Sequence, residues 1–167
     1  MYTFTNSPVI ETILGVQFQP LQSFSNAHLG AFWKELDEQW VDVSDAPLLP
    51  PQFELFGEAR TWAQVGSQLR VRVTQEVASR LQIRNATKDR MIQIQNSRLH
   101  YNWMGQGSNY PRYAKVRPEF DTVLTKLEQF LAKKSLGDLR RNQWEVTYIN
   151  HIPKGALWKN PQDLPQV

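Results

Sequence analysis

The side chains that could perform catalytic chemistry are few and widely spaced. The three histidines are His28, His100 and His151, and the chain has no cysteine. No two histidines are three or four residues apart, so neither a helical zinc pair nor a thiolate zinc site is predicted. A thiol nucleophile is excluded, and the Gly-x-Ser-x-Gly elbow of serine hydrolases does not occur. We therefore expect no metal and no cofactor, and an enzymatic function has no specific catalytic residue to support it.

Arginines that alternate with apolar residues give the clearest indication of a binding site. The alternation occurs in residues 69–74 and 80–84. On a strand, a period of two places the arginines on the face opposite the apolar side chains. Such a basic face could bind phosphates or an acidic protein segment, or it could be a solvated face that nearby acids dilute. The predicted members of this basic face are Arg70, Arg72, Arg80 and Arg84, with Arg98 and His100 on a neighbouring strand.

A second candidate is an aromatic and basic corner between a predicted hairpin and a predicted helix. Polar, aromatic and basic side chains at such a junction could form a recognition pocket. They could equally be structural, with a buried amide bonded to loop backbone and an arginine stacked on an aromatic ring, and both roles can hold together. The members of this corner are Asn102, Trp103, Tyr110, Arg112 and Tyr113.

Hydrophobic periodicity predicts the elements that must position these residues. A period of two predicts strands near residues 10–18, 53–55, 69–74, 80–84, 92–94, 99–103 and 144–148. Helical spacing predicts amphipathic helices over residues 29–40 and 120–131. The second helix either starts near Pro118 or extends back to Tyr113 with a kink at Pro118. Residues 44–52 are predicted to form a proline-rich loop. The chain order β-α-β-β-β-β-β-α-β indicates an α+β fold: one twisted, mainly antiparallel sheet of six or seven strands with both helices on one face.

Length and composition favour a single folded domain. The 167 residues are 41% hydrophobic, and we expect the domain to cover residues 1–152, with a proline-rich tail over residues 153–167 that docks loosely or begins a further segment. Neither a membrane span nor a secretory signal is found, so we expect a cytoplasmic protein without a membrane partner. Residues 1–66 hold two basic and eight acidic residues, whereas residues 67–167 hold seventeen and eight. These charges either neutralise each other across one fold or create a basic face.

Several segments between residues 7 and 152 resemble a known family. The late segment Tyr148-Ile149-Asn150 and the pair Phe32-Trp33 belong to the pattern, which resembles a sporadically distributed family of conserved hypothetical prokaryotic proteins. The resemblance implies no particular activity, and it implies that related chains often continue beyond the Tyr-Ile-Asn strand. The other segments of the pattern are Ser7-Pro8-Val9-Ile10-Glu11, Gly15-Val16-Gln17-Phe18, residues 94–103 and Tyr110-Pro111-Arg112-Tyr113.

Three functions are compatible with the sequence. The first is a non-enzymatic binding module that recognises a protein or a small anionic ligand through the basic face or the corner, and that could form a homo-oligomer through an exposed sheet edge. The second is nucleic-acid binding by the arginines, which would weaken steeply with salt. The third is a hydrolase or transferase with a dispersed site, which would require titratable side chains to converge in one pocket.

Overall fold

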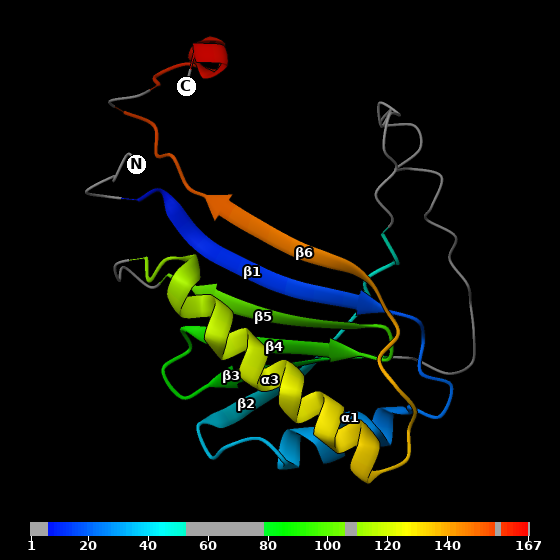
Figure 1. The fold of residues 1–167 in the computed structure, drawn as a ribbon. Helices are drawn as coiled ribbons and strands as arrows, with labels where there is room; N and C mark the ends of the chain where they lie inside the picture. The colour runs from blue at the N-terminus through cyan, green and yellow to red at the C-terminus, as the bar shows by residue number, and fades with distance from the viewer. Residues whose placement is uncertain (1–6, 53–78, 106–109, 156–157, 167) are drawn as a thin grey trace.

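A six-stranded antiparallel sheet carries two helices on one face in this computed structural model, which describes residues 7–52, 79–105, 110–155 and 158–166 (Figure 1). The sheet order is β2-β3-β4-β5-β1-β6. This arrangement confirms the predicted α+β fold. The elements in chain order are β1 (Val9–Phe18), α1 (Asn26–Lys34), β2 (Trp40–Ala46), β3 (Arg80–Asn85), β4 (Arg90–Gln95), β5 (Arg98–Met104), α3 (Tyr113–Lys133), β6 (Arg141–Asn150) and a short 3-10 helix (Pro161–Gln166).

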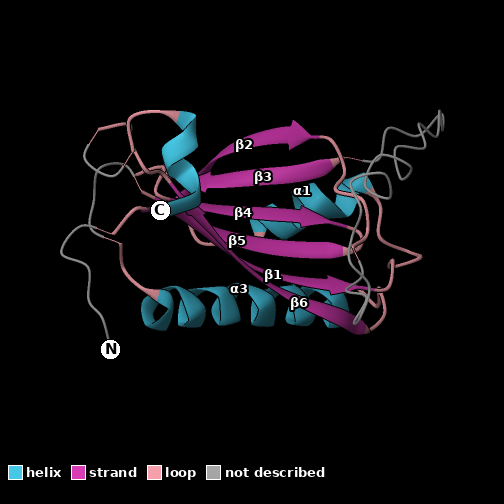
Figure 2. Ribbon diagram, turned by 90° about the horizontal axis from the view of Figure 1, so that it is seen from above, coloured by secondary structure: helices cyan, strands magenta, loops and turns pink. Residues whose placement is uncertain are grey.

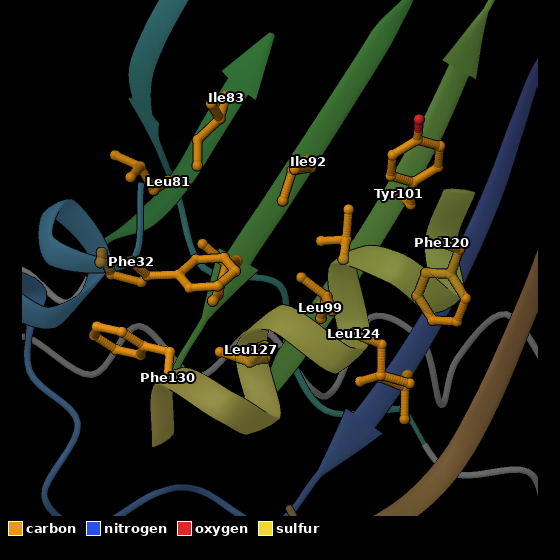
Figure 3. Close-up of a cluster of buried hydrophobic side chains, with 14 of the residues drawn as sticks. Phe32, Leu81, Ile83, Ile92, Leu99, Tyr101, Phe120, Leu124, Leu127 and Phe130 are labelled. Carbon is orange, nitrogen blue, oxygen red and sulfur yellow. The ribbon is translucent and has the colours of Figure 1, made fainter. Parts of the chain in front are cut away.

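The hydrophobic core lies between the sheet and the helices. Leu14 and Val16 of β1 point to the helix side with at most 2% of their surface exposed, as their period of two predicts. Phe32 of α1 and Phe130 of α3 meet edge to face, with ring centroids 5.6 Å apart (Figure 3). Both helices therefore cover one side of the sheet. The polar side chains on the opposite side must find hydrogen-bond partners elsewhere.

Helix α3 follows the longer of the two predicted starts. It begins at Tyr113 and runs through Pro118, which lies in its second turn. Proline lacks the N–H that would bond to the carbonyl of Ala114, so the helix gives up one backbone hydrogen bond there. The helix ends at Lys133, and the chain reverses through Ser135 and Gly137, both of which have positive φ.

The segment between α1 and β3 differs from its prediction. Helix α1 ends at Lys34, and Trp40 begins strand β2 instead of completing the helical stripe. The Trp33 indole N–H donates to the backbone carbonyl of Trp40 at 2.8 Å, which holds the turn between the two elements. Residues 44–46, predicted as loop, also belong to β2. The strands predicted near residues 53–55 and 69–74 lie outside the described residues.

The described part of the C-terminal segment bonds to itself. The Trp158 indole donates to the carbonyl of Ile152 at 2.8 Å, and the Asp163 carboxylate accepts the N–H groups of Lys159 and Asn160 at 2.8 and 2.9 Å. Figure 1 shows this segment leaving the sheet beyond the end of β6. Among the helices that the structure describes, none is long and apolar enough to cross a membrane.

Candidate binding surface

Strand β6 forms one edge of the sheet and carries an exposed apolar row. Trp144 and Val146 pair with the buried Val16 and Leu14 of β1, so their side chains lie on the helix side. Helix α3 lies on one side of the sheet (Figure 2), packs mainly against β1 and β5, and meets β6 at Trp144. Trp144 and Val146 therefore stay 53% exposed, and Tyr148 stays 44% exposed. We call Trp144, Val146 and Tyr148 the β6 row.

Aromatic contacts fix the two ends of the β6 row to the core. The Tyr148 ring meets Tyr110 edge to face at 6.4 Å between centroids, and Tyr110 in turn lies 5.3 Å from the buried Trp103. At the other end, Trp144 meets Phe120 of α3 edge to face at 6.2 Å. Because large rings hold one another in place, the row presents a preorganised surface rather than loose side chains.

Two arginines flank Trp144. The Cζ atoms of Arg117 and Arg141 lie 6.0 and 5.7 Å from the indole centroid, within the range of cation–π contacts. Both arginines also pair with acids of α3: Arg117 with Asp121 at 2.7 Å, and Arg141 with Glu128. The surface around the row is thus aromatic with a charge-balanced rim.

The other face of β6 is tied to β5 across a glycine of β1. Gly15 lies opposite both Glu145 and His100, and the His100 Nε2 atom lies 2.8 Å from a Glu145 carboxylate oxygen. A Cβ atom at Gly15 would stand 2.4 Å from His100 Cδ2, so the imidazole can cross β1 only over a glycine. The Arg98 guanidinium approaches the second Glu145 oxygen at 3.3 Å, an ion-pair contact without hydrogen-bond geometry.

The carboxylate of Glu145 is the charged centre of this arrangement. Burial raises the pKa of Glu145, but the hydrogen bond with His100 and the charges of His100 and Arg98 outweigh it, and the resulting pKa lies below the ordinary value. Only 14% of the Glu145 side chain is exposed, and His100 is 7% exposed. The pair is thus a covered structural link that holds β6 to the sheet.

Buried amides continue this polar network across the sheet. Asn102 donates to Glu11 at 2.6 Å and accepts from Gln93 at 2.9 Å, and Gln93 accepts from Gln82 at 3.1 Å. Each amide can donate and accept at once, so a row of amides can satisfy the buried polar side chains of neighbouring strands without adding charge. The face opposite the helices is therefore a bonded polar layer.

The expectation of an open basic face is wrong for Arg98 and His100. Arg98 is only 4% exposed, and it bonds to Gln17 as well as pairing with Glu145. The alternation placed both residues on the side away from the helices, but the carboxylate that sequesters them comes from β6, far along the chain.

Of the remaining arginines of the predicted basic face, the two that the structure describes, Arg80 and Arg84, are partly buried. Arg84 reaches Asp42 of β2 at 3.9 Å and is partly buried. Arg80 is also partly buried, and burial together with the charge of Arg98 lowers its pKa. Arg70 and Arg72 lie outside the described residues.

The predicted corner is divided between two sides of the sheet. Asn102 and Trp103 are consecutive on β5 and point to opposite faces, so they cannot line one pocket. Trp103 and Tyr110 instead support the β6 row, and Tyr113 lies beside it with its hydroxyl accepting from Arg117 at 3.0 Å. Arg112 is exposed and precedes α3 with a φ of 67°.

The sequence interpretation missed the exposure of the β6 row. The alternation in residues 144–148 predicts a strand, but the pattern by itself carries no sign that α3 leaves one face of this strand half exposed. Two features could have raised the question: β6 is the last predicted strand, and its apolar positions hold two large aromatic residues.

A pocket of about 410 Å³ lies between α3 and the turns that precede β2 and β4. Within it, Arg90 bonds to Glu119 at 2.6 Å and to Asp89 at 2.7 Å, and the Tyr101 hydroxyl donates to Glu119 at 2.8 Å. Burial and the Glu119 charge raise the pKa of Tyr101, so its hydroxyl remains protonated. These charged groups satisfy one another, and no cluster of the described residues could hold a metal ion.

Comparison with known proteins finds no match to this chain among family models, curated proteins or solved structures. The resemblance of the motifs to a prokaryotic family remains a prediction. The candidate site therefore depends on the geometry of β6.

Proposed function

We propose that the chain is a non-enzymatic binding module that accepts an extended protein segment along the edge of β6. The observation that carries this proposal is the β6 row, whose three apolar side chains stay 44 to 53% exposed on an edge strand of ten residues. An edge strand offers unpaired backbone N–H and C=O groups, and an added strand would satisfy them.

The β6 row adds specificity to such backbone pairing. Trp144 and Tyr148 are residue types that dominate binding energies at protein interfaces, because each buries a large area with few rotatable bonds. Their contacts with Phe120 and Tyr110 hold the rings in place before a partner arrives. An incoming strand with alternating apolar residues would complete the cover that α3 leaves unfinished.

A protein segment fits this surface better than an anion does. The arginines nearest to the row, Arg117 and Arg141, are neutralised by Asp121 and Glu128. On the opposite face, Arg98 is buried with Glu145. Phosphate or nucleic-acid binding needs cations that are free to release counterions, and paired arginines contribute little to it.

Selection of displayed extended peptides on sparsely immobilised protein tests the proposal. We expect the selected peptides to alternate apolar and polar residues. Replacing Trp144 and Tyr148 together with serine should abolish their binding, since it removes both anchors. The control Val41→Ser changes an equally exposed apolar residue on the other edge strand and should leave binding intact.

Two outcomes would contradict the proposed function. One is peptide binding that survives the serine replacements at positions 144 and 148. The other is the absence of peptide binding combined with salt-dependent binding of oligonucleotides, which would favour a basic surface instead.

A further inference from the structure

We propose that the strand accepted by β6 is β6 of a second copy of this chain, so that two sheets join edge to edge around a two-fold axis at Val146. This inference rests on the proposed function and names its partner. It follows from three properties of β6: the chemistry of its edge, the order of its side chains and the position of its charges.

Strand β6 lacks the lysine and proline residues that commonly keep an edge strand single, and its pairing with β1 is regular from Gln143 to Ile149. Edge strands are commonly protected by lysine, proline or exposed charges that point along the sheet. Strand β6 contains no lysine or proline; Arg141 is its first residue, and Glu145 turns inward to His100. The opposite edge differs, because β2 is only seven residues long and carries two acids, Asp42 and Asp45. Of the two edges, β6 is the one suited to pairing.

The β6 row is self-complementary in an antiparallel pair. In a two-fold pair of strands, opposed residues share a face, and each pair occurs twice. An axis at Val146 places Val146 opposite its own copy and Trp144 opposite the partner's Tyr148. Every position of the row then faces an aromatic or β-branched residue, the combination that stabilises cross-strand contacts. Glu145 falls opposite Thr147, a neutral residue.

The neighbouring registers fit less well. Moving the axis to Glu145 sets two carboxylates opposite each other, which is unfavourable. Moving it to Thr147 places Trp144 opposite Asn150, so the largest side chain of the row has no apolar residue to contact across the axis. One register is therefore selected by both packing and charge.

The helix layer is compatible with this pairing. A two-fold axis perpendicular to the sheet keeps the helices of both copies on the same side. The two β6 rows then merge into one aromatic stripe between the two copies of α3, each of which packs mainly against β1 and β5 of its own sheet. The described C-terminal residues bond among themselves and leave beyond the end of β6, so they do not occupy this edge.

Sedimentation analysis of the full chain over a wide concentration range tests the proposal. We expect the mass of a dimer, and we expect the variant Val146→Lys to lose it, because two lysines would meet at the axis. The matched control Val41→Lys changes a residue that is 56% exposed on β2 and should retain the dimer. A monomer at every concentration, or a dimer that Val146→Lys leaves intact, would overturn the proposal.

Cysteine cross-linking tests the register. The chain contains no cysteine, so each variant has a single thiol. With a short bis-maleimide, Val146→Cys should cross-link to itself, whereas Val41→Cys should not. Trp144→Cys and Tyr148→Cys should each cross-link poorly alone but efficiently when mixed, since they oppose each other. Equal cross-linking of all these combinations would refute the register.

The result separates the two proposals. A monomeric chain whose selected peptides still depend on Trp144 and Tyr148 would overturn self-association and leave strand binding standing. A monomeric chain that selects no such peptide would overturn both.

Discussion

Replacing Gly15 with alanine should strongly destabilise the fold through the side chain that crosses it. The new Cβ would lie 2.4 Å from Cδ2 and 2.9 Å from Nε2 of His100. Both distances are shorter than any stable contact, so the imidazole must move, and its 2.8 Å contact with Glu145 must break. Glu145 would then be largely buried with Arg98 as its remaining charged partner.

The magnitude follows from three contributions. Overpacking costs roughly 1 to 3 kcal/mol. Loss of a hydrogen bond to a charged group costs about 1.5 to 3 kcal/mol. Replacement of glycine in a strand interior offsets roughly 0.5 to 1 kcal/mol, because the unfolded chain loses freedom. We expect Gly15→Ala to lower the free energy of unfolding by about 3 kcal/mol, a large share of the ~5 to 15 kcal/mol of a typical domain.

Urea unfolding followed by tryptophan fluorescence measures this change. The control is Gly30→Ala, since a Cβ there meets no atom within 4 Å and the residue lies inside α1. Alanine at that helical position should stabilise the protein by roughly 0.5 to 1 kcal/mol. Opposite signs at the two glycines are expected only if contact with His100 causes the loss.

A double-mutant cycle with His100→Ala tests whether the cost of Gly15→Ala depends on the imidazole. Once the imidazole is absent, Gly15→Ala should cost little, because the atoms it would strike are gone. If the cost of Gly15→Ala is the same in both backgrounds, the two residues are uncoupled and the reasoning fails.

Two further predictions concern ionised groups. The pKa of Glu145 is lower in the folded protein than in the unfolded chain, so its contribution to stability should be complete above the unfolded value near 4.5 and should disappear as pH falls through the folded value. Urea unfolding at several pH values should show a larger acid loss of stability in the wild type than in Glu145→Gln, where Asp89 and Glu35, whose pKa values are also lowered, still contribute. Equal slopes in the two proteins would contradict this prediction. Glu119→Gln should destabilise the protein by about 1 to 3 kcal/mol, because it weakens the hydrogen bonds from both Arg90 and Tyr101. Lys126→Ala breaks only a pair with the exposed Asp37 and should cost less than about 1 kcal/mol. Thermal unfolding measures both changes, and the reverse order would disprove this ranking.

Local sequence patterns predicted the helices and strands better than they predicted the tertiary contacts of those elements. The alternation of Leu14 and Val16, the hairpin of strands 92–94 and 99–103 and the stripe of α3 each depend on neighbouring residues, and the structure has all three. Trp40 was misassigned because its spacing fits both a helical stripe and the start of a strand. Tertiary pairing with Asn85 of β3 decides between them.

The candidate site depends on contacts that no local pattern contains. Alternation correctly placed Arg98 and His100 away from the helices, but it could not supply their partner, Glu145, from the last strand. It also could not show that α3 leaves Trp144 and Val146 half exposed, since that depends on which strands lie under the helix. Which residues pair across strands, and which strands the helices cover, both depend on the order of the strands in the sheet. That order depends on the whole chain.

The place of β1 between β5 and β6 has a consequence for synthesis on the ribosome. Val16 pairs with Leu99 on one side and with Trp144 on the other, so the first strand to emerge waits for the last two to be translated. Pairings of such sequence separation form slowly, and a nascent chain that carries an unsatisfied strand is prone to aggregate. We expect this domain to complete its sheet only once β6 has left the ribosome, and to rely on holding chaperones until then.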